Sequence, residues 1–375
     1  MTLVARIMFK GAPIYIGDML LSSEGASDKS VDIPAARDIS AWLPPSVARR
    51  VSGLRQKLTI LDGGHIIAWA GNMLQARSLI KDIQLAITRG ARTWMDIQSV
   101  VEQVPLEDRD DVSLIGTIVC PETNSFENFC YEVQRISLGD IEVDAAGTGA
   151  NDIFEIITQL PIGNSEFERD GLFSFKAALA ISGVLVGHET FTGQNLLDWW
   201  GGAIEVAYLR QGKFEKLANV LHTLWKANKV GGGYELTLVP KFLKYDYFSD
   251  AFVAQTWDMG VVASAMGPRA KIREHTYRIY TSLLKSARDY DLSQFEPPDF
   301  NHTTLSCYVL MQPPIPHLGN LSHVYHSGSG DTPFRLTVHR QGIIQISYQG
   351  QLVVDLQRVI SEATGLPAKF CKIGY

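Results

Sequence analysis

Segments typical of β-strands and segments typical of α-helices occupy separate blocks along this chain. Strand-like blocks cover 3–18, 57–71, 113–146 and 203–209, and helix-like blocks cover 72–88, 94–104 and 150–186. Blocks of this kind predict an α+β fold in which sheets and helices form layers. They argue against a doubly wound parallel sheet, in which strands and helices alternate one by one.

A long polar stretch interrupts the first half of the chain. Residues 22–54 are rich in Ser, Asp and Pro, including a Pro-Pro pair at 44–45, and we interpret them as an insertion. A helix is expected at 217–227. The predicted organisation is one domain over 1–228 and a C-terminal extension over 229–375.

The C-terminal extension is expected to be β-rich and its role is unknown. Near its end, apolar runs separated by short Gly-containing turns predict strands at 334–338, 342–347 and 352–356.

Charge and composition exclude several classes of function. Lys and Arg number 34 against 40 Asp and Glu, and the net charge of −6 offers no general footprint for nucleic acid or anionic lipid. No run reaches the roughly 18 apolar residues of a membrane-spanning helix, and no export signal begins the chain. The four cysteines lack paired spacing, which is typical of a reducing compartment. We therefore expect a cytoplasmic protein without nucleic-acid or membrane partners.

Four short motifs stand at the boundaries of the predicted strands and helices. Thr2 leads the first strand and Asp18 ends the second, while Lys57 opens the third strand and Gly71 ends the fourth. The other two motifs are Gly147-Thr148-Gly149, before a helix, and Asp198-Trp199-Trp200-Gly201-Gly202, before an apolar strand. In this order the motifs resemble those of the proteasome β-subunit family, within the N-terminal-nucleophile (Ntn) hydrolases, over about residues 2–215.

The resemblance implies a four-layer αββα sandwich, two antiparallel sheets between helical layers, over 1–228. The chain departs from the family in three places. The insertion separates Asp18 from Lys57, Thr148 replaces a serine, and Gly201 stands where the family has a second serine.

Thr2 is the candidate nucleophile. A threonine hydroxyl is a poor nucleophile near neutral pH and needs a base within hydrogen-bond reach. The α-amino group of the same residue, with an unperturbed pKa of about 7.7–8.0, can be that base. Removal of Met1 would therefore create the nucleophile and its base together.

The remaining roles follow from the resemblance. Lys57 would activate the hydroxyl, Asp18 would orient the lysine, and the Gly71 N–H would form the oxyanion hole. Asp198 and the Thr148 hydroxyl would hold the amine and a water.

Substrate contacts are implied at Ser22, Trp69 and Met73. Trp69 falls where the family lines its main specificity pocket, and its indole predicts a shallow pocket that favours small substrate side chains.

Threonine-type hydrolysis of a polypeptide is the activity that this resemblance implies, in a homo-oligomeric ring supplied by an unfoldase or regulatory partner. No cofactor or metal is expected, because Gly147 and Gly149 lack the rest of a dinucleotide fingerprint and His317, His323 and His326 are loosely spaced. Two alternatives stay open, namely an inert Ntn-fold scaffold or interaction module and a non-peptide amidohydrolase. An intact Met1 would favour the scaffold.

Overall fold

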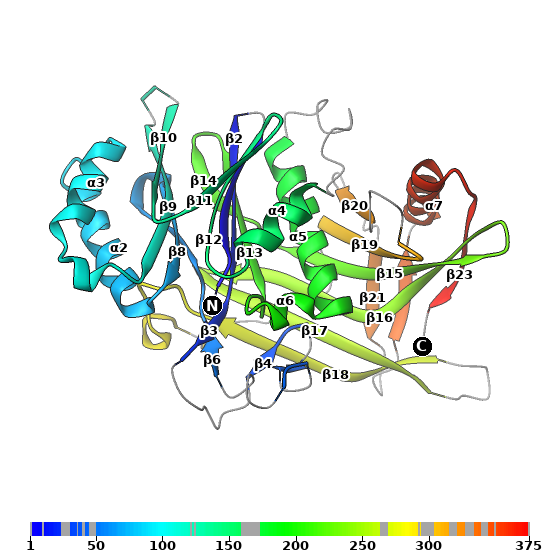
Figure 1. The fold of residues 1–375 in the computed structure, drawn as a ribbon. Helices are drawn as coiled ribbons and strands as arrows, with labels where there is room; N and C mark the ends of the chain where they lie inside the picture. The colour runs from blue at the N-terminus through cyan, green and yellow to red at the C-terminus, as the bar shows by residue number, and fades with distance from the viewer. Residues whose placement is uncertain are drawn as a thin grey trace.

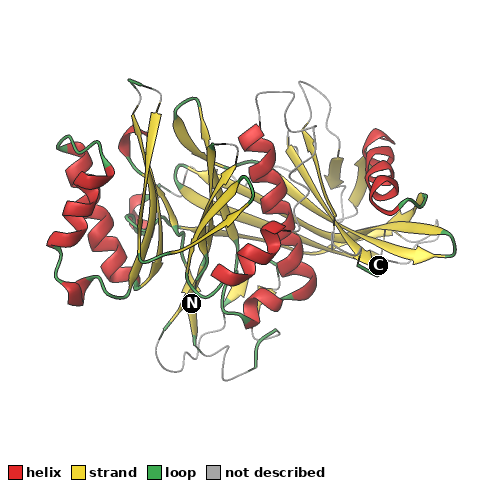
Figure 2. Cartoon of the chain, turned by 45° about the horizontal axis from the view of Figure 1, so that its top comes forward, coloured by secondary structure: helices red, strands yellow, loops and turns green. Residues whose placement is uncertain are grey.

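The computed structural model describes residues 2–9, 11–23, 31–35, 37–39, 42–44, 50–120, 122–123, 125–158, 173–262, 269–291, 293, 304–314, 321–326, 334–338, 344–348 and 350–373. Met1 lies outside these residues. From left to right in Figure 2, a helical layer, two sheets, a second helical layer and a third sheet follow one another. The predicted α+β class is confirmed.

A six-stranded antiparallel sheet carries the N-terminal hairpin (Figure 1). Its strands, in spatial order, are β11 (Gln134–Leu138), β12 (Ile141–Ala146), β1 (Val4–Phe9), β2 (Ala12–Asp18), β13 (Ile204–Arg210) and β14 (Lys213–Lys216). Val4 pairs with Gly17 and Asp18 pairs with Ile204. This register places the beginning of β1 beside the end of β2, so Thr2 and Asp18 become neighbours.

A four-stranded antiparallel sheet faces the first. It contains β10 (Ser125–Tyr131), β9 (Val112–Cys120), β8 (Ile66–Gly71) and β7 (Leu58–Ile60), and the 3-10 turn η2 (Asp62–Gly64) joins the last two. Val4 and Tyr15 of the first sheet share a buried apolar cluster with Leu58, Ile66 and Ile115 of the second. The two sheets therefore pack face to face through alternate side chains.

Helices cover the outer faces of both sheets. On the four-stranded sheet lie α2 (Met73–Thr88) and α3 (Trp94–Gln103), followed by the 3-10 turn η3 (Leu106–Asp108). On the six-stranded sheet lie α4 (Ala150–Thr158) and α5 (Phe173–Thr192), and α6 (Gln194–Leu197) follows α5. Asn72 caps α2 by accepting from two backbone N–H groups. No helix within the described ranges is long and apolar enough to span a bilayer.

A third sheet of seven strands lies against the far side of α5. Its strands are β18 (Arg269–Tyr280), β17 (Ala251–Val262), β16 (Gly233–Phe248), β15 (Val220–Val230), β19 (Thr304–Gln312) and β20 (Leu321–His326), with β23 (Ala368–Ile373) beside β16. The 3-10 turn η5 (Ala287–Asp289) follows β18. Helix α7 (Gly350–Thr364) covers the other face of this sheet through Leu352, Leu356 and Ile360.

Three small antiparallel ribbons complete the fold. They pair β3 (Leu20–Ser22) with β6 (Val51–Leu54), β4 (Asp32–Ile33) with β5 (Arg37–Asp38), and β21 (Phe334–Val338) with β22 (Ile344–Tyr348). The β3–β6 ribbon closes the two ends of the stretch interpreted as an insertion. The chain therefore leaves and re-enters the main body at neighbouring points.

Two predicted elements are wrong. The segment expected as a helix at 217–227 belongs largely to strand β15, so the domain boundary expected at 228 falls inside a strand. Leu221 and Trp225 pack toward α7 while Leu224 packs toward α5. A strand buried on both faces loses the alternating pattern, and its apolar run reads like a helix.

The strand expected at 352–356 is instead part of α7. Leu352, Leu356 and Ile360 are spaced four apart and are buried, whereas Val354 is exposed. The apolar run at 352–356 suggested a strand, but the helical spacing of the buried residues decides the structure.

Candidate active site

Thr2 and Asp18 form a direct contact inside the fold. The Thr2 hydroxyl donates to Asp18 Oδ1 at 2.8 Å, and the backbone N–H of Leu3 donates to the same oxygen at 2.9 Å. Thr2 is 2% exposed and Asp18 is completely buried. The register of the opening hairpin therefore brings Thr2 and Asp18 into contact.

Lys57 reaches the same carboxylate from the facing sheet. It stands directly before β7, and its Nζ lies 4.0 Å from Asp18 Oδ1. The ammonium also donates to the carbonyl of Leu20 at 3.1 Å and lies 4.6 Å from the centre of the Trp69 ring. The hydroxyl and the ammonium thus share one carboxylate oxygen. In this arrangement Asp18 fixes the orientation of the Thr2 hydroxyl, and the Lys57 ammonium can stabilise the alkoxide that forms when a base removes the hydroxyl proton.

Burial shifts both charged groups of this pair toward neutrality. Loss of water raises the pKa of the Asp18 carboxyl, while Lys57 and the backbone N–H groups of Leu3 and Gly201 act in the opposite direction. Burial lowers the pKa of the Lys57 ammonium, against the attraction of Asp18 and Glu205. Removing Lys57 would leave the Asp18 charge buried without its cation, at a cost of about 3–5 kcal/mol.

The turn of Gly147, Thr148 and Gly149 packs directly on Thr2. Thr148 Oγ1 accepts from the Thr2 backbone nitrogen at 3.3 Å, and the N–H of Gly149 donates to the Thr2 carbonyl at 3.1 Å. Gly147 has φ +92°, and a Cβ there would lie 2.2 Å from the Thr2 carbonyl oxygen. Only glycine permits this approach. The Thr148 hydroxyl therefore lies beside the Thr2 nitrogen, and its hold on a free amine stays a prediction.

Gly71 ends β8 in a conformation that favours glycine. Its φ is +92°, and a Cβ would lie 1.8 Å from the carbonyl oxygen of Asp111. Gly71 is exposed and directly precedes the Asn72 cap of α2. Its role as an oxyanion donor stays a prediction.

Asp198 lies at the end of α6, and its carboxylate accepts from Gln194 Nε2 at 3.3 Å. The two residues of this motif that reach the Thr2 site do so through the backbone. The carbonyl of Trp199 accepts from the Thr148 hydroxyl at 3.3 Å, and the N–H of Gly201 donates to Asp18 Oδ2 at 2.9 Å. The role of the Asp198 side chain toward the amine stays a prediction.

Glu189 of α5 occupies the space beside Gly201. A Cβ on Gly201, whose φ is +125°, would lie 2.2 Å from Glu189 Oε2. That oxygen accepts from the N–H of Gly202 at 2.7 Å and from Asn195 Nδ2 at 2.9 Å. Burial raises the pKa of Glu189 to about 7. The Glu189 side chain, which comes from α5, therefore fills the volume that a serine side chain at position 201 would occupy.

Sequence reasoning missed Glu189. A signal was present, because α5 is apolar nearly all round and a single acid in such a helix marks a specific buried contact.

A second buried acid that sequence reasoning missed holds the backbone of Lys57. Glu205 Oε2 accepts from the N–H of Lys57 at 2.7 Å and from that of Leu58 at 3.2 Å, while its Oε1 accepts from Lys216 Nζ at 2.7 Å. Glu205 is an isolated charge within the apolar strand β13, and that pattern was the available signal. Its contacts fix the point at which Lys57 enters the site.

The three predicted substrate contacts lie on three different elements. Ser22 ends β3, Trp69 is buried within β8, and Met73 opens α2. Met73 packs against the buried cluster that contains Trp69, and the Trp69 indole donates to the carbonyl of Gln56 at 3.2 Å. Their contact with substrate stays a prediction.

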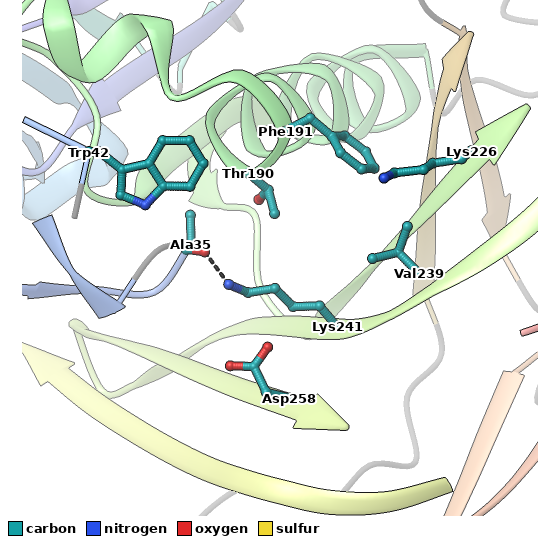
Figure 3. A pocket seen from close by; sticks show the side chains of 8 residues that line it. All are labelled: Ala35, Trp42, Thr190, Phe191, Lys226, Val239, Lys241 and Asp258. Atoms are coloured by element: carbon teal, nitrogen blue, oxygen red, sulfur yellow. Dashed lines mark hydrogen bonds between the residues drawn. The ribbon is translucent and has the colours of Figure 1, made fainter. Parts of the chain in front are cut away.

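A separate cavity of about 450 Å³ lies between the 22–54 stretch, α5 and the third sheet (Figure 3). It is lined by Ala35, Trp42, Thr190, Phe191, Lys226, Val239, Lys241 and Asp258. Lys241 donates to the carbonyl of Ala35, and Lys226 lies 5.8 Å from the Phe191 ring centre. Within the described part of the chain, no group of three or more His, Cys, Asp and Glu side chains is placed to hold a metal ion.

No protein-family model matches the sequence, and no curated protein matches it. Among solved structures, the chain is similar to an Anbu (Gly-1) mutant from Hyphomicrobium sp. strain MC1, with 13% sequence identity and a TM-score of 0.33. The similarity covers 58% of this chain and 87% of that one.

Proposed function

We propose that the chain is a threonine-type Ntn hydrolase that cleaves peptide bonds with Thr2 after removal of Met1. The observation that carries the proposal is the buried Asp18 Oδ1, which accepts from the Thr2 hydroxyl at 2.8 Å and lies 4.0 Å from the Lys57 ammonium. The layer order of helix, sheet, sheet and helix over the first part of the chain is consistent with the Ntn sandwich that the motifs imply.

The proposed reaction has two stages. In the first, the Thr2 hydroxyl oxygen bonds to the carbonyl carbon of the scissile peptide while the hydroxyl proton passes to the free Thr2 amine. The C–N bond then breaks, and the leaving amine takes that proton. In the second stage, water attacks the resulting ester, which releases a carboxylic acid and restores the Thr2 hydroxyl.

Each neighbouring group has a defined part in this proposal. Lys57 stabilises the developing alkoxide, Asp18 orients the lysine and the hydroxyl, and the Thr148 hydroxyl positions the nitrogen of Thr2. The Gly71 N–H stabilises the oxyanion, and Asp198 supports the amine. We extend the proposal to a cytoplasmic homo-oligomer that acts on polypeptides delivered by a partner, with 1–228 as the hydrolase domain. The family resemblance supports this extension.

The proposal is tested by covalent labelling. Purified protein is first examined by intact-mass spectrometry for loss of Met1, and is then treated with a peptide epoxyketone, which bonds to both the hydroxyl and the amine of an N-terminal threonine. We expect one adduct, mapped to Thr2. Thr2→Ala should give none, and Thr2→Ser, which keeps a hydroxyl, should retain some labelling. Absence of an adduct on a chain that begins at Thr2 would contradict the proposal.

An inert scaffold is the second candidate. Its supporting observation is that Thr2, Asp18 and Lys57 are nearly inaccessible, with exposed fractions of 2%, 0% and 1%. Such groups can stabilise a fold without meeting a substrate. Intact Met1 together with full resistance to the epoxyketone would favour this candidate.

A further inference from the structure

The turn that follows β18 shares a buried apolar cluster with Trp69 and Met73, two of the residues predicted to contact substrate. It covers 281–290 and is drawn in yellow near the N-terminus in Figure 1. Leu283 is 1% exposed and belongs to the same buried cluster as Trp69. Leu21, Met73 and Leu284 pack against that cluster. The C-terminal extension therefore contributes an aliphatic side chain to the apolar cluster that contains Trp69, the residue predicted to line the specificity pocket.

Residues next to Lys57 hold this turn in place. The Arg55 guanidinium donates to the carbonyls of Leu283 and Lys285 at 3.3 and 2.5 Å, and also to the Thr281 hydroxyl. The neighbouring Gln56 amide donates to the carbonyls of Asp250 and Tyr280 at 2.9 and 2.5 Å. The same short segment thus presents Lys57 to Asp18 and anchors the turn of the extension.

Polar contacts hold most of the turn, and few of its side chains are buried and apolar: Leu283 and, at 9% exposure, Tyr290, whose hydroxyl bonds to Ser282. Leu283 is its one apolar side chain below 2% exposure among the described residues, and the ion pair of Lys285 with Asp250 leaves the two side chains 45% and 39% exposed. Exposed ion pairs contribute little to stability. Segments with few buried apolar contacts open at a lower free energy than the core does.

We propose that residues 281–290 close the candidate specificity pocket by placing Leu283 in it, and that a polypeptide with a leucine-sized aliphatic side chain takes that place when the turn moves away. The inference rests on the proposed function, because it takes Trp69 and Met73 as walls of the pocket. The pocket then suits a larger side chain than the indole of Trp69 alone predicts.

Leu283 belongs to the same chain as the pocket, so it competes strongly with the side chain of a free peptide for that place. A side chain tethered a few residues from its site acts at an effective concentration in the millimolar range. A free peptide therefore binds poorly until the tethered leucine is removed or its anchor is weakened.

The experiment compares the full chain with Leu283→Ala in two measurements. The first is binding of acetyl-Leu-Leu-Leu-amide by calorimetry, which needs no nucleophile. The second is the rate of Thr2 labelling by a leucine-bearing peptide epoxyketone. Leu283→Ala should bind the peptide and be labelled at least about tenfold better than the unchanged chain.

Leu352→Ala is the matched control, because it removes an equally buried leucine from α7 on the far face of the third sheet. It should behave like the unchanged chain in both measurements. Asp250→Ala is the second variant, since it removes the carboxylate that accepts from Ser282 and Lys285 and leaves the core intact. It should change both measurements in the same direction as Leu283→Ala.

The two measurements separate this inference from the proposed function. Tighter peptide binding without labelling in any variant would support the closed pocket and contradict the hydrolase. Equal labelling of the unchanged chain and both variants, without a gain in binding, would overturn the closed pocket and leave the hydrolase standing. No gain in binding and no labelling would overturn both.

Discussion

Glu189, a buried acid beside the candidate site, makes the stability of the folded chain depend on pH. Burial raises its pKa from 4.5 to about 7, the N–H of Gly202 and the Asn195 amide oppose that shift, and nearby Asp18 adds to it. Between about pH 4.5 and pH 7, the folded chain holds a proton that the unfolded chain has released. The contribution of this group to stability therefore falls as pH rises through that interval and is constant above it.

Glu189→Gln should remove this part of the pH dependence. The neutral amide keeps an acceptor for Gly202 and has no charge to bury. The free energy of unfolding of the unchanged chain should lose on the order of 3 kcal/mol more than that of the variant between pH 4.5 and pH 7. Urea unfolding at several pH values measures the difference. Glu102→Gln, on the exposed face of α3, is the control and should leave the pH profile unchanged; parallel profiles for Glu189→Gln and the unchanged chain would contradict the assignment.

Gly201 is a residue at which the family motif and this structure disagree. Gly201→Ser would restore the motif's hydroxyl but place a Cβ 2.2 Å from Glu189 Oε2. We expect it to lose roughly 2 kcal/mol more stability than Gly139→Ser, because Gly139 also has a positive φ but has no atom within 4 Å of the Cβ position. Chemical denaturation of both variants tests this. Equal losses would show that Glu189 moves aside easily.

The residues of the candidate site that could be predicted from the sequence are those in motifs at the ends of strands. Thr2, Asp18 and Lys57 stand at predicted strand boundaries, and local sequence is enough to locate them. Glu189 comes from a distant part of the chain, and Arg55, although it stands two residues before Lys57, finds its partners at Leu283 and Lys285, so the contacts of both residues depend on how α5 and the third sheet dock. Spacing along the sequence does not encode that docking.

At the scale of elements, α5 is packed on both faces. One face joins the core of the six-stranded sheet and the other meets the third sheet through Val186 and Tyr308. The same two-sided burial explains why β15 was predicted as a helix. A strand that is apolar on both faces does not show the alternation of apolar and polar residues that identifies a strand. The α2 helix, with one buried face, was predicted at 72–88 and is observed at Met73–Thr88.

Gly187 sets the distance between α5 and the third sheet. A Cβ at Gly187 would lie 2.2 Å from the Tyr308 ring, so Gly187→Ala should push the helix and sheet apart and cost about 1–3 kcal/mol. Gly350→Ala, also in a helix but with no atom within 4 Å of the Cβ position, should be neutral or slightly stabilising. Thermal unfolding of both variants measures the contrast. A neutral Gly187→Ala would mean that this contact is loosely packed.

At the scale of the whole molecule, the extension is built into the fold. It covers α5, supplies the anchors of Arg55 and Gln56, and places Leu283 in the cluster of the four-stranded sheet. Three separate contacts of this kind couple the stability of the two predicted domains.

We therefore expect the chain to unfold in one cooperative transition. Urea unfolding followed by tryptophan fluorescence and by far-ultraviolet circular dichroism should give coincident curves. Leu352→Ala, made in α7, should move both curves to lower urea by the same amount, with a loss of about 2–5 kcal/mol. Two separated transitions, with only one sensitive to Leu352→Ala, would show that the extension folds independently.

The inward position of the Thr2 nitrogen has a practical consequence for anyone who prepares this protein. That nitrogen is hydrogen-bonded to Thr148 within the packed turn at 147–149. An affinity tag fused ahead of Thr2 would block the α-amine that the proposed mechanism uses as its base. An affinity tag is therefore better placed after Tyr375, where it does not interfere with removal of Met1 in the cell.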